Sequence, residues 1–389
     1  MGDELHPGHR TALLDWLACA VGGHDERATR AARSLADGLG GRIAAAGTAG
    51  HVLDYDDTYA PGLAHLSAPV APAALLLGAE LGASTGEALR AFAAGFEFAG
   101  RLTAANHPRM RAPGWHPTAV GGVAGAALAC ARLRGLDEAR TAHALRLALL
   151  QAAGLRSAFG SDGKALQVGR AAAAGAAAAR LAAAGAVASA DIAQGDGGFE
   201  QAYRARWVEP GAPAGRGPAA AENWIKAYPC CLQTHGAIEA AALAREAGTD
   251  ASAELAVTVH PVCLHAASRG PDVADGLEAK FSIPYLTAYA LLHGPPDLAS
   301  FAAVDEDARR LAARVTVRTD PALRESEAVL EADGARAGHV EAALGSPGRP
   351  MDEARLRAKI RELAGERLDG VIDDLGAPVA RVVEAAGLG

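Results

Sequence analysis

The residues best suited to chemistry gather in the segment HVLDYDDT (51–58), which His65 follows closely. Ionisable side chains at this density are costly to bury in an alanine-rich chain unless they serve a purpose. Carboxylates and neutral histidines at close spacing suit general acid–base catalysis. The structural alternative is a solvated loop in which Asp57 or Thr58 caps the next helix. DYDD also fits a magnesium–diphosphate site, but two asparagines and 4% aromatic residues argue against the partner motif and aromatic cavity such sites need.

A second cluster, GWHPT (114–118), opens a glycine-rich apolar stretch. Pro117 suits the first turn of a helix, so His116 is expected at or just before the helix N-terminus. Free N–H groups and positive potential at that position favour an anionic substrate. The structural alternative is a capping histidine packed beside Trp115.

Lysine is so rare in this chain that each one draws attention. Of 37 basic residues only four are lysines, namely Lys164, Lys226, Lys280 and Lys359. Lysine offers a compact charge with a tunable pKa, which arginine does not. Lys164 ends the loop GSDGK, which lacks P-loop spacing, and Lys226 lies in WIKAYPCC, whose adjacent cysteines are poor zinc ligands. We expect Lys359 to lie on a surface helix.

Composition narrows the class of protein. The 389 residues are 50% hydrophobic, which excludes disorder, and a net charge of −8 without a basic run disfavours nucleic-acid binding. The polar start MGDELHPGHR lacks the apolar core of a secretory signal. The alanine-rich stretch 171–190 is broken by Arg180 and is too weakly apolar to span a membrane. We therefore expect a cytoplasmic protein that binds neither membrane nor nucleic acid.

The elements that must position these clusters change character along the chain. About a quarter of the residues are alanine, the best helix former, and the chain to about residue 225 is expected to be helices joined by short loops, one starting at Ser84 or Thr85. Segments 255–264 and 313–320 alternate and are rich in β-branched residues, as strands are. A helix is expected to start near Pro284, and a hairpin to turn at Asp333-Gly334.

We therefore predict a mainly α fold with an α+β insert. A large all-helical domain is expected at 1–225, a smaller α+β lid domain at 226–349, and a return of the chain to the helical domain at 350–389.

The clusters, in this order, resemble the MmgE/PrpD family. The resemblance rests on HVLDYDDT, HLSAPV, GWHPT, K-x4-GRAAAAG, KAYPCC and KFSIPY, and it spans about residues 10 to 370. It implies a helical large domain, a small α+β lid and an active site between them. It also implies a homodimer.

The same resemblance implies roles for individual residues. The expected catalytic residues are Asp54, His65, His116, Lys164, Lys226 and Tyr285, and the two lysines are expected to face one cleft with the two histidines. Beside them, we expect Thr58, Trp115, Arg170, Cys231 and His235 to contact the substrate. Three positions depart from the family pattern: Tyr59 replaces a histidine, Leu66 a proline, and Cys231 the histidine of the decarboxylase-like branch.

The hypothesis is a cofactor-independent lyase or isomerase that removes a proton α to a carboxylate of a di- or tricarboxylate. Lysines and histidines would stabilise the developing negative charge without a metal. A 2-methylcitrate dehydratase-like hydro-lyase is the first choice, and an iminodisuccinate-type epimerase or a cis-aconitate-type decarboxylase is the alternative. A non-catalytic carboxylate-binding or scaffold homologue is the rival from another class.

Overall fold

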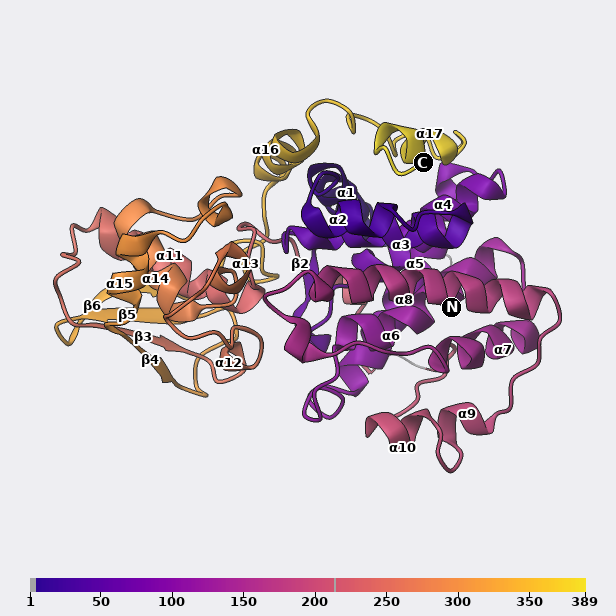
Figure 1. The fold of residues 1–389 in the computed structure, drawn as a ribbon, viewed down its shortest axis with the longest axis horizontal. Helices are drawn as coiled ribbons and strands as arrows, with labels where there is room; N and C mark the ends of the chain where they lie inside the picture. The colour runs from indigo at the N-terminus through magenta and orange to yellow at the C-terminus, as the bar shows by residue number, and fades with distance from the viewer. Residues whose placement is uncertain (1–4, 213–214) are drawn as a thin grey trace.

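The computed structural model describes residues 5–212 and 215–389, which form two lobes of unequal size (Figure 1). The larger lobe holds the helices α1 (Pro7–Gly22), α2 (Arg27–Arg33), α3 (Gly38–Val52), α4 (Ser67–Glu80), α5 (Thr85–Ala105), α6 (Pro117–Leu133), α7 (Glu138–Leu149), α8 (Gly163–Ala183), α9 (Asp191–Gln194), α10 (Phe199–Tyr203), α16 (Glu353–Ala364) and α17 (Ala380–Ala385). The smaller lobe holds α11 (His235–Glu246), α12 (Cys263–Ala266), α13 (Gly276–Ala279), α14 (Ile283–His293) and α15 (Glu306–Ala312) with the strands β3 (Leu255–Val259), β4 (Val315–Thr319), β5 (Ala328–Ala332) and β6 (Ala335–Val340). Short 3₁₀ turns lie at Ala60–Gly62, Arg156–Ala158, Ala219–Ala221, Leu232–Thr234 and Ala299–Phe301.

Local signals set the ends of the larger lobe's helices. Ser84 caps α5 in a reciprocal pair with Glu87, and His116 precedes Pro117 at the start of α6, so both predicted starts are confirmed. Small residues let the helices pack closely: a Cβ on Gly175 of α8 would lie 2.5 Å from the Val123 carbonyl oxygen of α6. Among the described residues, no helix has the length and hydrophobicity needed to cross a membrane.

The smaller lobe is a four-stranded sheet covered by helices. The strand order is β4-β3-β5-β6, with β3 and β4 parallel and the other neighbours antiparallel. Helix α11 packs on β5 and β6, and α14 packs on α11 and β4. The β5–β6 hairpin turns at Asp333 and Gly334, whose φ angles of 50° and 76° suit a two-residue turn, so this prediction is also confirmed.

The two lobes have separate hydrophobic cores. One core extends from α1 to α10 and includes Ile360, Leu363 and Val382, because α16 packs on α1 and α17 on α4. The other core lies between the sheet and α11, α14 and α15. The expected fold class, a mainly helical domain with an α+β insert, is therefore confirmed.

One detail differs from the expected all-helical first part. Strand β1 (Thr58–Tyr59) pairs antiparallel with β2 (Asn223–Trp224). The pairing arises because the segment after α3 lies beside the segment that leads into the smaller lobe. Thr58 is therefore a strand residue, and it caps no helix.

Candidate active site

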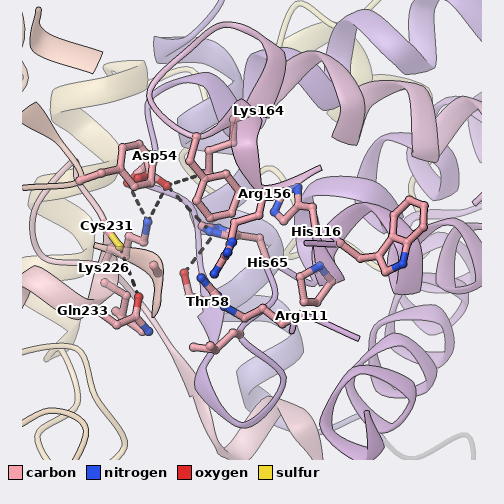
Figure 2. Close-up of a pocket in the computed structure, with 17 residues that line it drawn as sticks. Asp54, Thr58, His65, Arg111, His116, Arg156, Lys164, Lys226, Cys231 and Gln233 are labelled. Atoms are coloured by element: carbon pink, nitrogen blue, oxygen red, sulfur yellow. Dashed lines mark hydrogen bonds and ion pairs between the residues drawn. The ribbon is translucent and has the colours of Figure 1, made fainter. Parts of the chain in front are cut away.

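A cavity between the lobes brings the candidate clusters together (Figure 2). Its lining is Asp54, Thr58, Leu63, His65, Arg111, Trp115, His116, Pro117, Arg156, Phe159, Lys164, Lys226, Cys231, Leu232, Gln233, Ala266 and Phe281. The last six come from the smaller lobe or the segment leading into it, and the others come from segments of the larger lobe. The two lysines and two histidines expected to share a cleft do line one cavity.

Asp54 is the anion at one end of the cavity. Its Oδ1 accepts hydrogen bonds from Lys164 Nζ at 2.6 Å and Lys226 Nζ at 2.9 Å, and its carbonyl oxygen accepts a second bond from Lys226 at 2.9 Å. Asp54 has a φ of 54°, a left-handed conformation that aspartate tolerates better than most residues. Burial alone would raise the pKa of Asp54, but the two lysines outweigh burial and hold it well below its usual value. Asp54 is therefore an ionised partner of the two lysines.

Asp56 holds two histidine rings. Its Oδ2 lies 2.9 Å from His51 Nδ1 and 3.0 Å from His65 Nδ1, and all three side chains are buried. An ionised carboxylate only accepts, so both rings carry their proton on Nδ1. Burial lowers the pKa of His65 to about 3, against the opposing effect of Asp56, so the ring is neutral. His65 Nε2 then has a free lone pair, and it lies 3.8 Å from Asp54 Oδ1.

His116 has the opposite tautomer, and a glutamine fixes it. Gln167 Oε1 accepts from Leu155 N at 2.9 Å, while its Nε2 donates to Leu155 O at 3.2 Å and lies 2.7 Å from His116 Nδ1. The backbone of Leu155 thus orients the amide, and His116 Nδ1 must accept. Burial, with Lys164 adding to it, lowers the pKa of His116 well below its usual value. The neutral ring therefore carries its proton on Nε2.

Sequence reasoning did not identify Gln167, Arg111 or Arg156 as site residues. The signal for Gln167 was its position three residues after Lys164 on α8, which places both side chains on one face. Arg111 precedes His116 by five residues, but nothing in the pattern shows that its segment folds back into the cavity. Arg156 enters from the turn after α7.

The other expected substrate contacts divide into two groups. Thr58, Trp115 and Cys231 line the cavity, with Thr58 Oγ1 3.4 Å from His65 Nδ1. Burial raises the pKa of Cys231 to about 11, so its thiol is protonated. His235 is fully buried against Tyr228, next to the cavity wall but not among the residues that line it.

Like His235, two further expected site residues do not line the cavity. Arg170 is exposed and lines a separate groove with residues of α2 and α3. It lies six residues after Lys164 on α8, so the helical rotation carries it to another face. Tyr285 is buried in the smaller lobe, where its hydroxyl accepts a 2.9 Å bond from Asp305 N. Its position on α14 directs the ring into the core.

The expectation for Lys359 was wrong, because this residue is 4% exposed. Its Nζ contacts Asp15 Oδ1 at 2.6 Å and donates to the carbonyl oxygens of Tyr55 at 2.7 Å and Lys226 at 3.0 Å. Lys280 Nζ likewise donates to Leu53 O at 2.6 Å. All four lysines of the chain thus bind the segment from Leu53 to Tyr55.

His51, Asp56 and His65 also form the one described group whose ligand atoms, within 4.8 Å of one another, could share a metal ion. Both imidazoles already donate their Nδ1 protons to Asp56. A metal held at those nitrogens would have to displace both protons. In the structure, Asp56 already accepts hydrogen bonds from the Nδ1 atoms of both histidines.

Comparison with known proteins agrees with this architecture. Residues 42–207 match the MmgE/PrpD N-terminal domain, and residues 228–374 match the MmgE/PrpD C-terminal domain. The chain is also 28% identical over 216 residues to human cis-aconitate decarboxylase. That match covers 51% of this chain and 43% of the relative, so the chain is matched to less than half of the relative's length. The two domain matches together cover most of the sequence, and the chain belongs to the MmgE/PrpD family.

Proposed function

We propose that the protein is a lyase or isomerase that removes a proton α to a carboxylate of a di- or tricarboxylate, most simply as a hydro-lyase. The observation that carries the proposal is the pair of opposite histidine tautomers in one cavity. His65 offers a lone pair at Nε2 and His116 a proton at Nε2. A base and an acid facing one substrate are what an elimination of water requires.

In the proposed reaction, each polar residue of the cavity has a separate role. His65 Nε2 takes the α-proton, and Thr58 and Asp56 hold its ring. Negative charge grows on the substrate carboxylate, where Lys164 and Lys226 stabilise it. His116 Nε2 gives its proton to the departing hydroxyl, so that an alkene and water leave and the ring is left as an imidazolate beside the Lys164 cation. Solvent then removes the proton from His65 and restores the one on His116, which returns both rings to their starting tautomers.

Epimerisation and decarboxylation are the alternatives within the same family. An epimerase would use the same proton abstraction and return a proton to the opposite face, and His116 would supply it. A decarboxylase would lose CO₂ instead of a proton, as the name of the human relative states for that protein. Cys231 stands where the decarboxylase-like branch carries histidine, and its protonated thiol would be a poor substitute.

One assay distinguishes these reactions. The protein is incubated separately with 2-methylcitrate, citrate, cis-aconitate and iminodisuccinate, while alkene absorbance, CO₂ release and optical rotation are followed. We expect alkene formation from a hydroxy acid without CO₂. Binding of these acids without turnover would contradict the proposal and favour the non-catalytic homologue.

We further propose that the protein acts as a cytoplasmic homodimer and needs no cofactor. Sedimentation equilibrium should give twice the mass of the 389-residue chain, and a monomer at micromolar concentration would contradict the dimer. Cell fractionation tests the location.

A further inference from the structure

Arg111 is a buried cation with no counterion among residues 5–212 and 215–389. The residue is only 4% exposed and lines the cavity, yet its Nε and Nη2 find no hydrogen-bond partner in the described part of the chain. Leaving a buried charged donor unpaired is costly, so such a group indicates that the cavity binds an anionic partner.

Within the described part of the chain, no carboxylate acts on Arg111. The groups that act on it electrostatically are Arg156 and Cys231, while Arg111 itself lowers the pKa of His107 and His265. Burial and Arg156 lower the pKa of Arg111 to about 10, so it stays charged at neutral pH. The other end of the cavity differs, because Asp54 there lies against Lys164 and Lys226.

The two ends are separated by the reacting groups. In Figure 2, Arg111 lies on the far side of His65 from Asp54. Arg156 contributes a second guanidinium to the same cavity and is half-buried. A guanidinium offers paired donors that match the two oxygens of a carboxylate.

We propose that Arg111, with Arg156, binds a second carboxylate of the substrate, remote from the reacting carbon. This assignment rests on the proposed function and narrows it. The substrate would be at least a dicarboxylate with one carboxylate at Lys164 and Lys226 and another at the arginines. Monocarboxylates and remote mono-amides would be poor substrates because they leave Arg111 unpaired.

The test compares Arg111→Gln and Arg111→Lys with Arg109→Gln, an exposed arginine of the same segment. For the acid that is turned over, Arg111→Gln should raise KM at least tenfold. The wild-type preference for that acid over its remote mono-amide should fall at least tenfold. Arg111→Lys should retain part of the preference, because it keeps the charge but loses the fork. Arg109→Gln should behave as the wild type.

Binding of tricarballylate, an unreactive tricarboxylate, gives a readout that does not need turnover. Calorimetry should show it binding at least tenfold more weakly to Arg111→Gln, with propionate weak for both proteins. Without ligand, Arg111→Gln should melt no lower than the wild type, which separates lost binding from misfolding. Unchanged tricarballylate affinity and unchanged acid-over-amide preference would overturn the subsite while leaving the proposed function intact. Arginine-dependent binding with no turnover of any acid would overturn the proposed function and leave the subsite.

Discussion

Lys359 Nζ donates a 3.0 Å hydrogen bond to the carbonyl oxygen of Lys226, although the two residues lie 133 positions apart in the chain. The same ammonium group contacts Asp15 Oδ1 and Tyr55 O and lies 3.9 Å from the Tyr55 ring centroid. Helix α16 thus fixes the backbone that carries both Lys226 and the segment after α3. Each of the four lysines in this arginine-rich chain binds the segment after α3, at Leu53, Asp54 or Tyr55.

Lys359 should therefore be essential to stability. Lys359→Met leaves Asp15 buried without its cation, and breaking a buried pair in this way costs about 3–5 kcal/mol. We expect a loss of that size in the free energy of unfolding, measured with urea. Arg357→Gln, an exposed neighbour on α16, is the matched control and should change stability by less than about 0.5 kcal/mol. A Lys359→Met protein as stable as the control would show that the pair is dispensable.

Lys164→Arg and Lys226→Arg should each lower kcat/KM at least tenfold. Lys226 is 1% exposed and both ammonium groups meet one oxygen of Asp54, so a planar guanidinium does not fit beside the remaining ammonium group. Steady-state kinetics on the acid that is turned over gives the value. Arg180→Lys, exposed on the same helix as Lys164, is the control. If either variant has near-normal kcat/KM, the replaced lysine has no specific role in the reaction.

His116→Ala should lower kcat by about 100-fold or more, as losses of acid–base groups do, with little change in KM.

Gln167→Glu tests the tautomer of His116 separately. A carboxylate at this position would accept from Nδ1, which transfers the ring proton away from Nε2 and raises the pKa of His116. We expect kcat to fall at least tenfold and its pH profile to shift to higher pH. Gln167→Met, which lacks the charge, should lower kcat without shifting the profile. If neither variant changes kcat, His116 does not depend on Gln167.

Stability should fall as the solution is acidified below about pH 6.5. The pKa values of His65 and His235 are lowered to about 3, mainly by burial, whereas those of an unfolded chain lie near 6.5. Between those values the unfolded chain binds protons that the folded chain does not, so the free energy of unfolding decreases as pH falls. Each such histidine contributes up to about 1.4 kcal/mol per pH unit. Urea unfolding at pH 7, 6 and 5 measures the slope, and constant stability over this range would contradict neutral buried histidines.

Activity should survive removal of metal ions. His65 and His51 donate to Asp56 in the positions that a metal would need. We expect the same kcat before and after EDTA treatment, and no gain on adding Mg²⁺, Zn²⁺ or Fe²⁺. Loss with EDTA and recovery with one of these ions would assign a metal to the three residues.

Sequence patterns over a few neighbouring residues predicted many of the helix starts and turns. Contacts between residues that lie far apart in the chain could not be predicted in this way. A cap at Ser84 and a turn at Asp333-Gly334 depend on neighbours within a few residues, so the pattern suffices. The burial of Lys359 depends on Asp15, which is 344 residues away in the sequence. The expected substrate contact of Arg170 was wrong for a geometric reason. Arg170 lies close to Lys164 in the sequence, but the two side chains are on different faces of α8.

The chain enters and leaves the smaller lobe at adjacent points, because Ile225 N donates a 3.1 Å bond to Gly345 O. Gly345 has a φ of 88°, and a Cβ there would lie 1.9 Å from Ile225 O, so only glycine permits this approach. The smaller lobe is thus a cassette whose ends meet, and it carries Lys226, Cys231, Gln233 and Phe281 with it. Exchange of this cassette between relatives, in evolution or in an engineered chimaera, replaces one wall of the cavity and leaves His65, His116 and their partners in place.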